Sequence, residues 1–126
     1  MVTLQQRLDQ ARKLRLEGYN CAQCVAMAFN SELGNITSGL GGGVGGTGHI
    51  CGAASAMAVV VGHKEFHQPT DKAAVYAHVQ QLLKDFALRN QGQTNCCDLR
   101  KPGRKSCLAL IEDAVEILHN EYANEE

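Results

Sequence analysis

Six cysteines are the residues of this sequence with the most distinctive chemistry. The thiolate is the nucleophilic and metal-binding form of cysteine, so such a set suits either thiol–disulfide exchange or metal ligation. Six in 126 residues is below the density of a small disulfide-stapled scaffold. The pattern therefore favours redox or metal chemistry over structural bridges. The cysteines are Cys21, Cys24, Cys51, Cys96, Cys97 and Cys107.

Three of these cysteines fall where the sequence predicts the start of a helix. Cys21, Cys51 and Cys107 each lie in a first helical turn, and Cys96-Cys97 lie in the loop before the last helix. Helix N-termini carry partial positive charge and free N–H groups, which stabilise a thiolate. We therefore expect a thiolate of low pKa in this set, with Cys51 as the candidate for attack.

Cys21 and Cys24 form a C-x-x-C pattern. Residues three apart share one face of a helix, so the two sulfurs suit one disulfide or one metal ion. A thioredoxin-like motif needs a preceding strand, which the sequence lacks, and c-type haem attachment needs a histidine where Val25 stands. A structural zinc site pairs two such units. Burial of Cys24 in the core remains an alternative.

A glycine-rich loop precedes Cys51. Seven of the ten residues 39–48 are glycine. They include a formal G-x-G-x-x-G, but without a leading strand this does not predict dinucleotide binding. The loop suits either N–H groups crowding a bound sulfur, cluster or small anion, or close packing over a buried helix. We take Gly52 and His49 as candidate cofactor contacts, with His49 as an extra ligand or base. The other four histidines we interpret as surface or packing residues.

Hydrophobic spacing predicts the elements that position these groups. Apolar residues recur at helical spacing, with N-caps at Thr3, Asn20 and Ser106. We predict an all-α fold, a single domain over 1–126: a compact bundle of about five helices around a buried central helix at 51–61. Loops 35–48 and 91–105 and the connector 63–69 join them, and residues 123–126 should fray. The predicted helices are 3–17, 20–33, 51–61, 70–90 and 106–122.

The net charge and hydropathy of the sequence argue against binding to nucleic acid and against insertion in a membrane. Twelve basic and 13 acidic side chains give a net charge of −1, which offers no attraction to nucleic acid or to an anionic membrane. The longest apolar run, 56–61, is too short to span a bilayer, and the N-terminus lacks the apolar core of a signal peptide. We expect a cytoplasmic protein without membrane insertion. The basic segment 100–105 is interpreted as a solvated loop; the alternative is that it lowers nearby thiol pKa values or attracts an anionic partner.

The cysteine pattern resembles a known family. Gly18-Tyr-Asn-Cys21-Ala-Gln, the glycine-rich loop, Cys51-Gly-Ala-Ala-Ser-Ala-Met-Ala and two later cysteines resemble the redox-active protein family named for its C_GCAxxG_C_C pattern. Ala56 replaces the final glycine of the central motif, which Gly52 and Ala53 match. The resemblance implies a small helical redox protein, often encoded beside transporter genes and similar to part of certain cytochromes that carry iron–sulfur. The site cysteines it implies are Cys21, Cys51, Cys96 (or its neighbour Cys97) and Cys107.

Three hypotheses for function follow. The first is thiol–disulfide redox chemistry by four converging cysteines, in the manner of a thiol–disulfide oxidoreductase acting on a partner protein or small thiol. The second is an iron–sulfur or zinc module with the same cysteines as ligands. The third is a non-enzymatic helical adaptor, in which replacing all four cysteines would cost some stability but no function.

Overall fold

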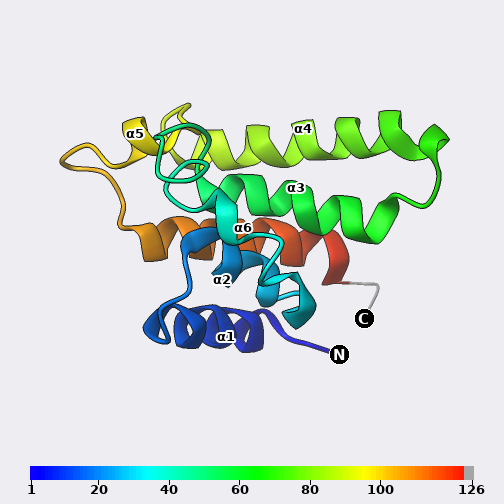
Figure 1. Cartoon of the computed structure of the whole chain (residues 1–126), viewed down its shortest axis with the longest axis horizontal. Helices are drawn as coiled ribbons and strands as arrows, with labels where there is room; N and C mark the ends of the chain where they lie inside the picture. Colours follow the sequence, from blue (N-terminus) through cyan, green and yellow to red (C-terminus); the bar gives the residue numbers. More distant parts are fainter. Residues whose placement is uncertain (124–126) are drawn as a thin grey trace.

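The computed structural model describes residues 1–123, and that part of the chain is built from α-helices and short 3₁₀ turns without a β-strand (Figure 1). The all-α prediction is confirmed. The fraying expected over 124–126 lies outside the described residues. The α-helices are α1 (Leu4–Leu16), α2 (Cys21–Met27), α3 (Gly52–Glu65), α4 (Lys72–Arg89), α5 (Cys96–Leu99) and α6 (Cys107–Tyr122); the 3₁₀ turns are η1 (Ser31–Leu33), η2 (Ser38–Leu40) and η3 (Pro69–Asp71).

Side-chain caps fix where the helices begin. Thr3 and Gln6 form a reciprocal capping box at α1, and Asn20 and Gln23 form another at α2. The Ser106 hydroxyl accepts a hydrogen bond from a backbone N–H in the first turn of α6. Each cap satisfies N–H groups that have no partner within the helix. The three N-caps expected from the sequence are confirmed.

Two helix ends differ from the prediction. The second helix ends at Met27 rather than at Leu33, because Asn30 is extended (φ −154°) and caps the separate turn η1. The third helix does not stop before Gly62 but continues to Glu65. An interior glycine costs a helix only about 1 kcal/mol, which packing overrides. The short helix α5, inside the predicted loop 91–105, was not expected.

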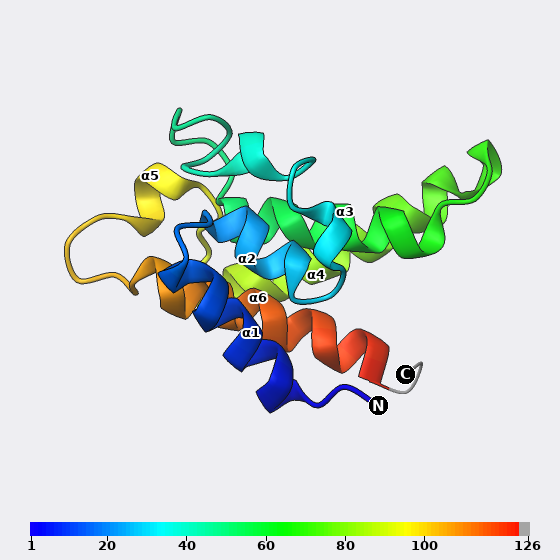
Figure 2. The same ribbon diagram turned by 60° about the horizontal axis from the view of Figure 1, so that its bottom comes forward.

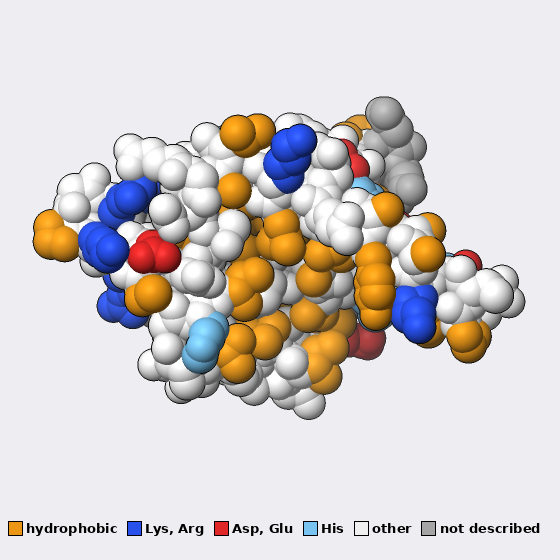
Figure 3. Space-filling view, turned by 90° about the horizontal axis from the view of Figure 1, so that it is seen from above, with side chains coloured by type: hydrophobic (Ala, Val, Ile, Leu, Met, Phe, Trp, Pro, Cys, Tyr) orange, Lys and Arg blue, Asp and Glu red, His pale blue; other side chains and the backbone are white. Residues whose placement is uncertain are grey.

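The helices pack around α3 and α6. α3 contacts α2, α4 and α6, whereas α6 contacts α1, α2, α3 and α4. Phe86 of α4 and Met57 of α3 are among the largest fully buried side chains. The outer stripe of α3 is only half-buried: apolar side chains gather on the face shared with α4 (Figure 3), where Ala58 and Val79 line a shallow hollow. The predicted central helix is thus buried on most of its circumference.

The two central helices have the same orientation, and this positions the site. α3 and α6 both begin at the left of Figure 1, where α5 and the glycine-rich loop also lie, and both end at the right. The view in Figure 2 shows the same grouping, with the hairpin of α3 and α4 extending away from it. Several helix N-termini therefore share one end of the molecule.

Candidate functional site

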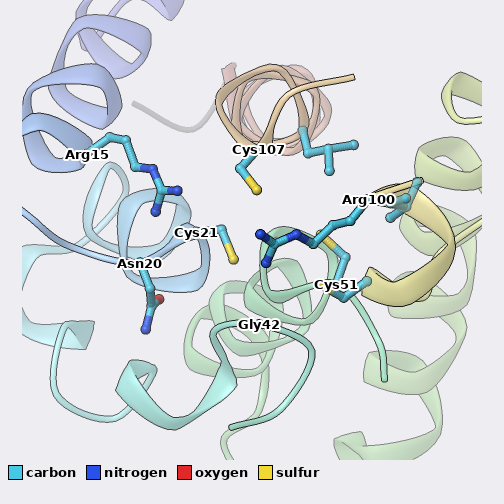
Figure 4. Close-up of a pocket in the computed structure, with 10 residues that line it drawn as sticks. Arg15, Asn20, Cys21, Gly42, Cys51, Arg100 and Cys107 are labelled. Atoms are coloured by element: carbon cyan, nitrogen blue, oxygen red, sulfur yellow. The ribbon is translucent and has the colours of Figure 1, made fainter. Parts of the chain in front are cut away.

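Four cysteines line one cavity at that end of the molecule. The cavity has a volume of about 140 Å³ and is walled by residues from α1, α2, α5, α6 and the loop before α3. In Figure 4 the labelled cysteines surround a common space. Each cysteine stands at the start of a different helix: Cys21 is the first residue of α2, Cys51 the N-cap of α3, Cys96 the first residue of α5 and Cys107 the first residue of α6.

A short antiparallel pairing holds Cys96 next to Cys51. The backbone N–H of Cys51 donates to the Thr94 carbonyl at 2.7 Å, and the N–H of Cys96 donates to the His49 carbonyl at 2.6 Å. Cys96 is 9% exposed and lines the cavity, whereas its neighbour Cys97 is exposed and does not. Of the two adjacent cysteines that the sequence left open, Cys96 is therefore the one at the cavity.

The glycine-rich loop packs against this pairing. Residues 42–46 all have positive φ, and Val44 (φ 65°) is the one among them that is not glycine. A Cβ on Gly43 would lie 2.6 Å from the backbone of His49 and 2.8 Å from the Cβ of Cys96. Only a residue without a side chain permits so close an approach. The loop thus fixes the strand-like segment that carries Cys96.

Gly52 and His49 have different positions relative to the cavity. A Cβ on Gly52 would lie 2.6 Å from the Cys21 sulfur, so the missing side chain lets this thiol approach the start of α3. The His49 ring is exposed, lies 2.6 Å from the Thr47 hydroxyl through Nδ1, and does not line the cavity. Its backbone, rather than its ring, supports Cys96. Cofactor binding by either residue stays a prediction.

Burial decides the protonation of Cys51. The thiol is 4% exposed, and burial raises its pKa to about 11. Hydrogen bonds from the N–H groups of Ala54 and Ala53 act in the opposite direction, and the neighbouring thiols of Cys21 and Cys96 raise the pKa further. The effect of desolvation on the Cys51 pKa therefore outweighs the effect of the N–H groups at the start of α3. The expectation that the Cys51 thiol has a low pKa was wrong.

Cys24 lies away from the cavity. It is fully buried in the core, with its sulfur 3.6 Å from the Tyr19 carbonyl oxygen. Burial raises its pKa to about 11, although Arg15 acts to lower it. All six cysteines are free thiols, and Cys21 alone of the C-x-x-C pair lines the cavity. The pattern therefore divides into one cavity thiol and one core thiol.

The described residues do not present a ready metal-ligand set. Within residues 1–123, no group of three or more His, Cys, Asp or Glu side chains is arranged to hold a metal ion. The cysteines of these residues are therefore not arranged as a ligand set for a single metal ion such as zinc. Iron–sulfur binding by Cys21, Cys51, Cys96 and Cys107 stays a prediction. We derive no step through a metal.

Two arginines also line the cavity, and sequence reasoning missed their role. Arg15 comes from the last turn of α1 and Arg100 from the end of α5, and both extend their guanidinium groups toward the thiols (Figure 4). Arg100 belongs to the basic segment 100–105 that was interpreted as solvated. Nothing in the sequence pointed to Arg15, because helical spacing does not show what lies beyond a helix end.

Comparisons with known proteins agree with the cysteine pattern. The family described as "Putative redox-active protein (C_GCAxxG_C_C)" matches residues 19–121. An uncharacterized protein of Archaeoglobus fulgidus is 29% identical over 113 residues, covering 76% of this chain and 74% of that protein. No solved structure matches the chain significantly. No helix within residues 1–123 has the length and apolar character to cross a membrane. Since the family match spans most of the sequence and contains the four cavity cysteines, the chain belongs to the C_GCAxxG_C_C family.

Proposed function

We propose that this protein is a thiol–disulfide oxidoreductase whose cavity cysteines exchange two electrons with a thiol or disulfide partner. The observation that carries the proposal is the cavity itself, which collects four free thiols from the starts of four helices. Thiols so far apart in sequence do not share a cavity by local structure alone. Membership of a redox-active family supports the same chemistry.

Cys21 and Cys51 are the pair we assign to the exchange. Cys21 is half-buried at the cavity wall, where a small disulfide can reach it. Cys51 is 4% exposed and has a raised pKa, so it is a poor first nucleophile but a protected second thiol. The Cys21 sulfur lies against the bare Cα of Gly52, directly after Cys51. Cys107, also half-buried, is the alternative attacking thiol, and Cys96 the alternative second thiol.

The exchange is balanced in atoms and electrons. The Cys21 thiolate attacks one sulfur of a disulfide R–S–S–R, forming a mixed disulfide and releasing RS⁻. The Cys51 sulfur then gives up its proton, attacks Cys21 and releases a second RS⁻. The protein loses two electrons and becomes a disulfide, the substrate gains two and becomes two thiols, and the two thiol protons pass to the products. Two thiols of the partner restore the protein by the reverse steps: the first forms a mixed disulfide with Cys21, and the second releases it as R–S–S–R.

Thiol counting before and after mild oxidation tests the proposal. We expect the protein to lose two titratable thiols on treatment with a small disulfide and to regain them with reductant. Peptide mapping by mass spectrometry should identify a Cys21–Cys51 bridge. Replacement Cys51→Ser should leave a mixed disulfide on Cys21 and no internal bridge, because the second thiol is missing.

Cys24→Ala and Cys97→Ser are the matched controls, since neither residue lines the cavity. Both variants should still lose and regain two thiols. A two-thiol loss that persists in both Cys21→Ser and Cys51→Ser would contradict the assigned pair. Absence of any reversible loss in the wild-type protein would overturn the function and leave the helical adaptor as the better hypothesis.

The metal-binding alternative has its own test. Protein purified without oxygen and without a metal-affinity tag should be colourless and contain neither iron nor zinc in stoichiometric amount. Broad sulfur-to-iron charge-transfer bands, or one equivalent of zinc, would favour the metal module instead.

The partner is either a redox protein or a small thiol. The functional link to a transporter implied by the family resemblance stays a prediction. So does the cytoplasm, whose reducing pool would keep the cysteines in the thiol state that the exchange needs.

A further inference from the structure

The cavity wall carries positive charge. Among the residues that line it, Arg15 and Arg100 are the charged side chains, and no carboxylate faces them. The Asn20 amide adds a neutral polar group, while Leu99 and Leu110 supply apolar surface. A hollow that joins thiols, two guanidinium groups and short apolar walls has the features that would recognise a small, negatively charged sulfur compound.

These two arginines are not neutralised by nearby acids. Neighbouring cations of the same basic segment are paired: Lys101 lies 3.3 Å from Asp98, and Lys105 lies 2.7 Å from Asp113. Arg100 makes no side-chain hydrogen bond or ion pair within residues 1–123. The Arg15 guanidinium donates to one neutral acceptor, the Tyr19 carbonyl, at 3.3 Å. Both charges therefore remain available to an anion that enters the cavity.

The size of the cavity limits the substrate. At about 140 Å³ it holds several water molecules, since one water needs roughly 10–15 Å³ measured in this way. That space admits a short aliphatic chain with a terminal carboxylate. Arginine binds carboxylates in a planar, two-point geometry.

We propose that the cavity selects low-molecular-weight disulfides that carry carboxylates. The inference rests on the function proposed above and names its substrate class. The carboxylate pairs with Arg100 and Arg15, the short chain contacts Leu99 and Leu110, and the disulfide lies at Cys21. The exchange then proceeds as described: the dithiol becomes a protein disulfide, and the substrate leaves as two carboxylate thiols.

Three disulfides of similar length and different charge provide the test. Dithiodipropionate is a dianion, hydroxyethyl disulfide is neutral and cystamine is a dication. Their rates of oxidation of the full-length protein are each divided by the rate with mercaptoethanol, which removes their intrinsic reactivity. We expect the normalised rates to fall in that order, with the dianion at least roughly tenfold above the neutral compound at low salt.

Charge-removing variants locate the effect. Arg100→Gln should lower the ratio of the dianion rate to the neutral rate roughly tenfold and raise the ratio of the cystamine rate to the neutral rate. Arg15→Gln should act in the same direction. Arg104→Gln is the matched control, because Arg104 belongs to the same segment but lines a different hollow and contacts Gln91. Circular dichroism confirms that each variant is folded.

The outcomes separate this inference from the function on which it rests. Equal normalised rates for the three compounds, or a fall by the same factor for all three in Arg100→Gln, would overturn charge selection while leaving the exchange intact. The second result would assign the arginines to thiolate stabilisation alone. If no compound converts the protein to its internal disulfide, the proposed function fails first.

Discussion

Helices α3 and α6 carry thiols at their N-terminal ends and contribute to a cluster of carboxylate, phenol and imidazole groups at their C-terminal ends. At their starts these helices contribute Cys51 and Cys107 to the thiol cavity, and at their other ends Glu65 and Tyr122 meet His78 of α4. The N-terminus of a helix has free N–H groups and partial positive charge, whereas its C-terminus has free carbonyl groups and partial negative charge. The same pair of helices thus serves two clusters with different electrostatics.

Burial has different consequences in the two clusters. Burial by itself lowers the pKa of His78, but hydrogen bonds to Glu121 and Glu65 outweigh it and raise the pKa above its ordinary value. His78 contacts Glu65 at 2.7 Å and contacts Glu121 on its other side. At Cys51 the opposing groups are N–H dipoles, and burial prevails. A full opposite charge in contact overcomes desolvation, and two backbone dipoles do not.

The largest expected loss of stability comes from a substitution in the glycine-rich loop beside the cavity. Gly43→Ala places a Cβ 2.6 Å from the His49 backbone at a φ of +75°, so the segment carrying Cys96 must move. We expect a loss of about 3 kcal/mol in the free energy of unfolding, measured by urea denaturation. Gly46→Ala has similar φ but open space around it, and should lose only about 1 kcal/mol. Equal losses in the two variants would show that the close packing of Gly43 against His49 and Cys96 does not contribute to the free energy of unfolding.

The second effect concerns the protonation of Cys51. Because its pKa is about 11, the rate of Cys51 alkylation by iodoacetamide should rise roughly tenfold between pH 9 and pH 10. A thiol with the ordinary value of 9.0 would rise less than about twofold over that interval. Peptide-resolved mass spectrometry measures the rate, and circular dichroism checks that the protein stays folded. A plateau by pH 9 would restore Cys51 as a low-pKa nucleophile.

The third prediction concerns the pH dependence of stability that comes from His78, beside the C-terminal ends of α3 and α6. The folded-state pKa of His78 is raised above its ordinary value of 6.5, so protonation of His78 stabilises the fold. That stability is fully present below pH 6.5 and is lost as pH rises through the raised pKa. His78→Gln should remove this pH dependence, because the group whose protonation stabilises the fold is then absent. Thermal unfolding from pH 5 to pH 9 measures it.

His67→Gln is the control for that experiment, because His67 is exposed. It should retain the pH dependence of the wild-type protein. If His78→Gln retains it as well, Glu65 and Glu121 do not outweigh the burial of this ring.

The smallest effect is expected from an exposed charge near the cavity. Lys101 pairs with Asp98 of α5 at 3.3 Å, and the Lys101 side chain is 65% exposed. Water screens such a pair, so Lys101→Gln should change the free energy of unfolding by less than about 0.5 kcal/mol in urea. A loss above about 1 kcal/mol would mean that α5 depends on this charge to hold Cys96.

The sequence alone determined the features with short-range causes. Thr3, Asn20 and Ser106 were recognised as N-caps, because a cap acts within three residues of its own position. The apolar spacing of 106–122 predicted α6 for the same reason. The locations of Cys21 and Cys107 at helix starts followed directly from the caps at Asn20 and Ser106, and that of Cys51 followed from the apolar run after it.

Only the tertiary structure decided which groups meet and what they do to one another. α5 has four residues, too few for a periodic signal, and its pairing partner lies more than forty positions away in the chain. Arg15 and Arg100 reach the cavity only because α1 and α5 end at the same place. The direction of the Cys51 pKa shift depends on desolvation, which sums over every atom packed around the sulfur. This desolvation depends on contacts between segments that are distant in the chain, and a local sequence pattern does not show those contacts.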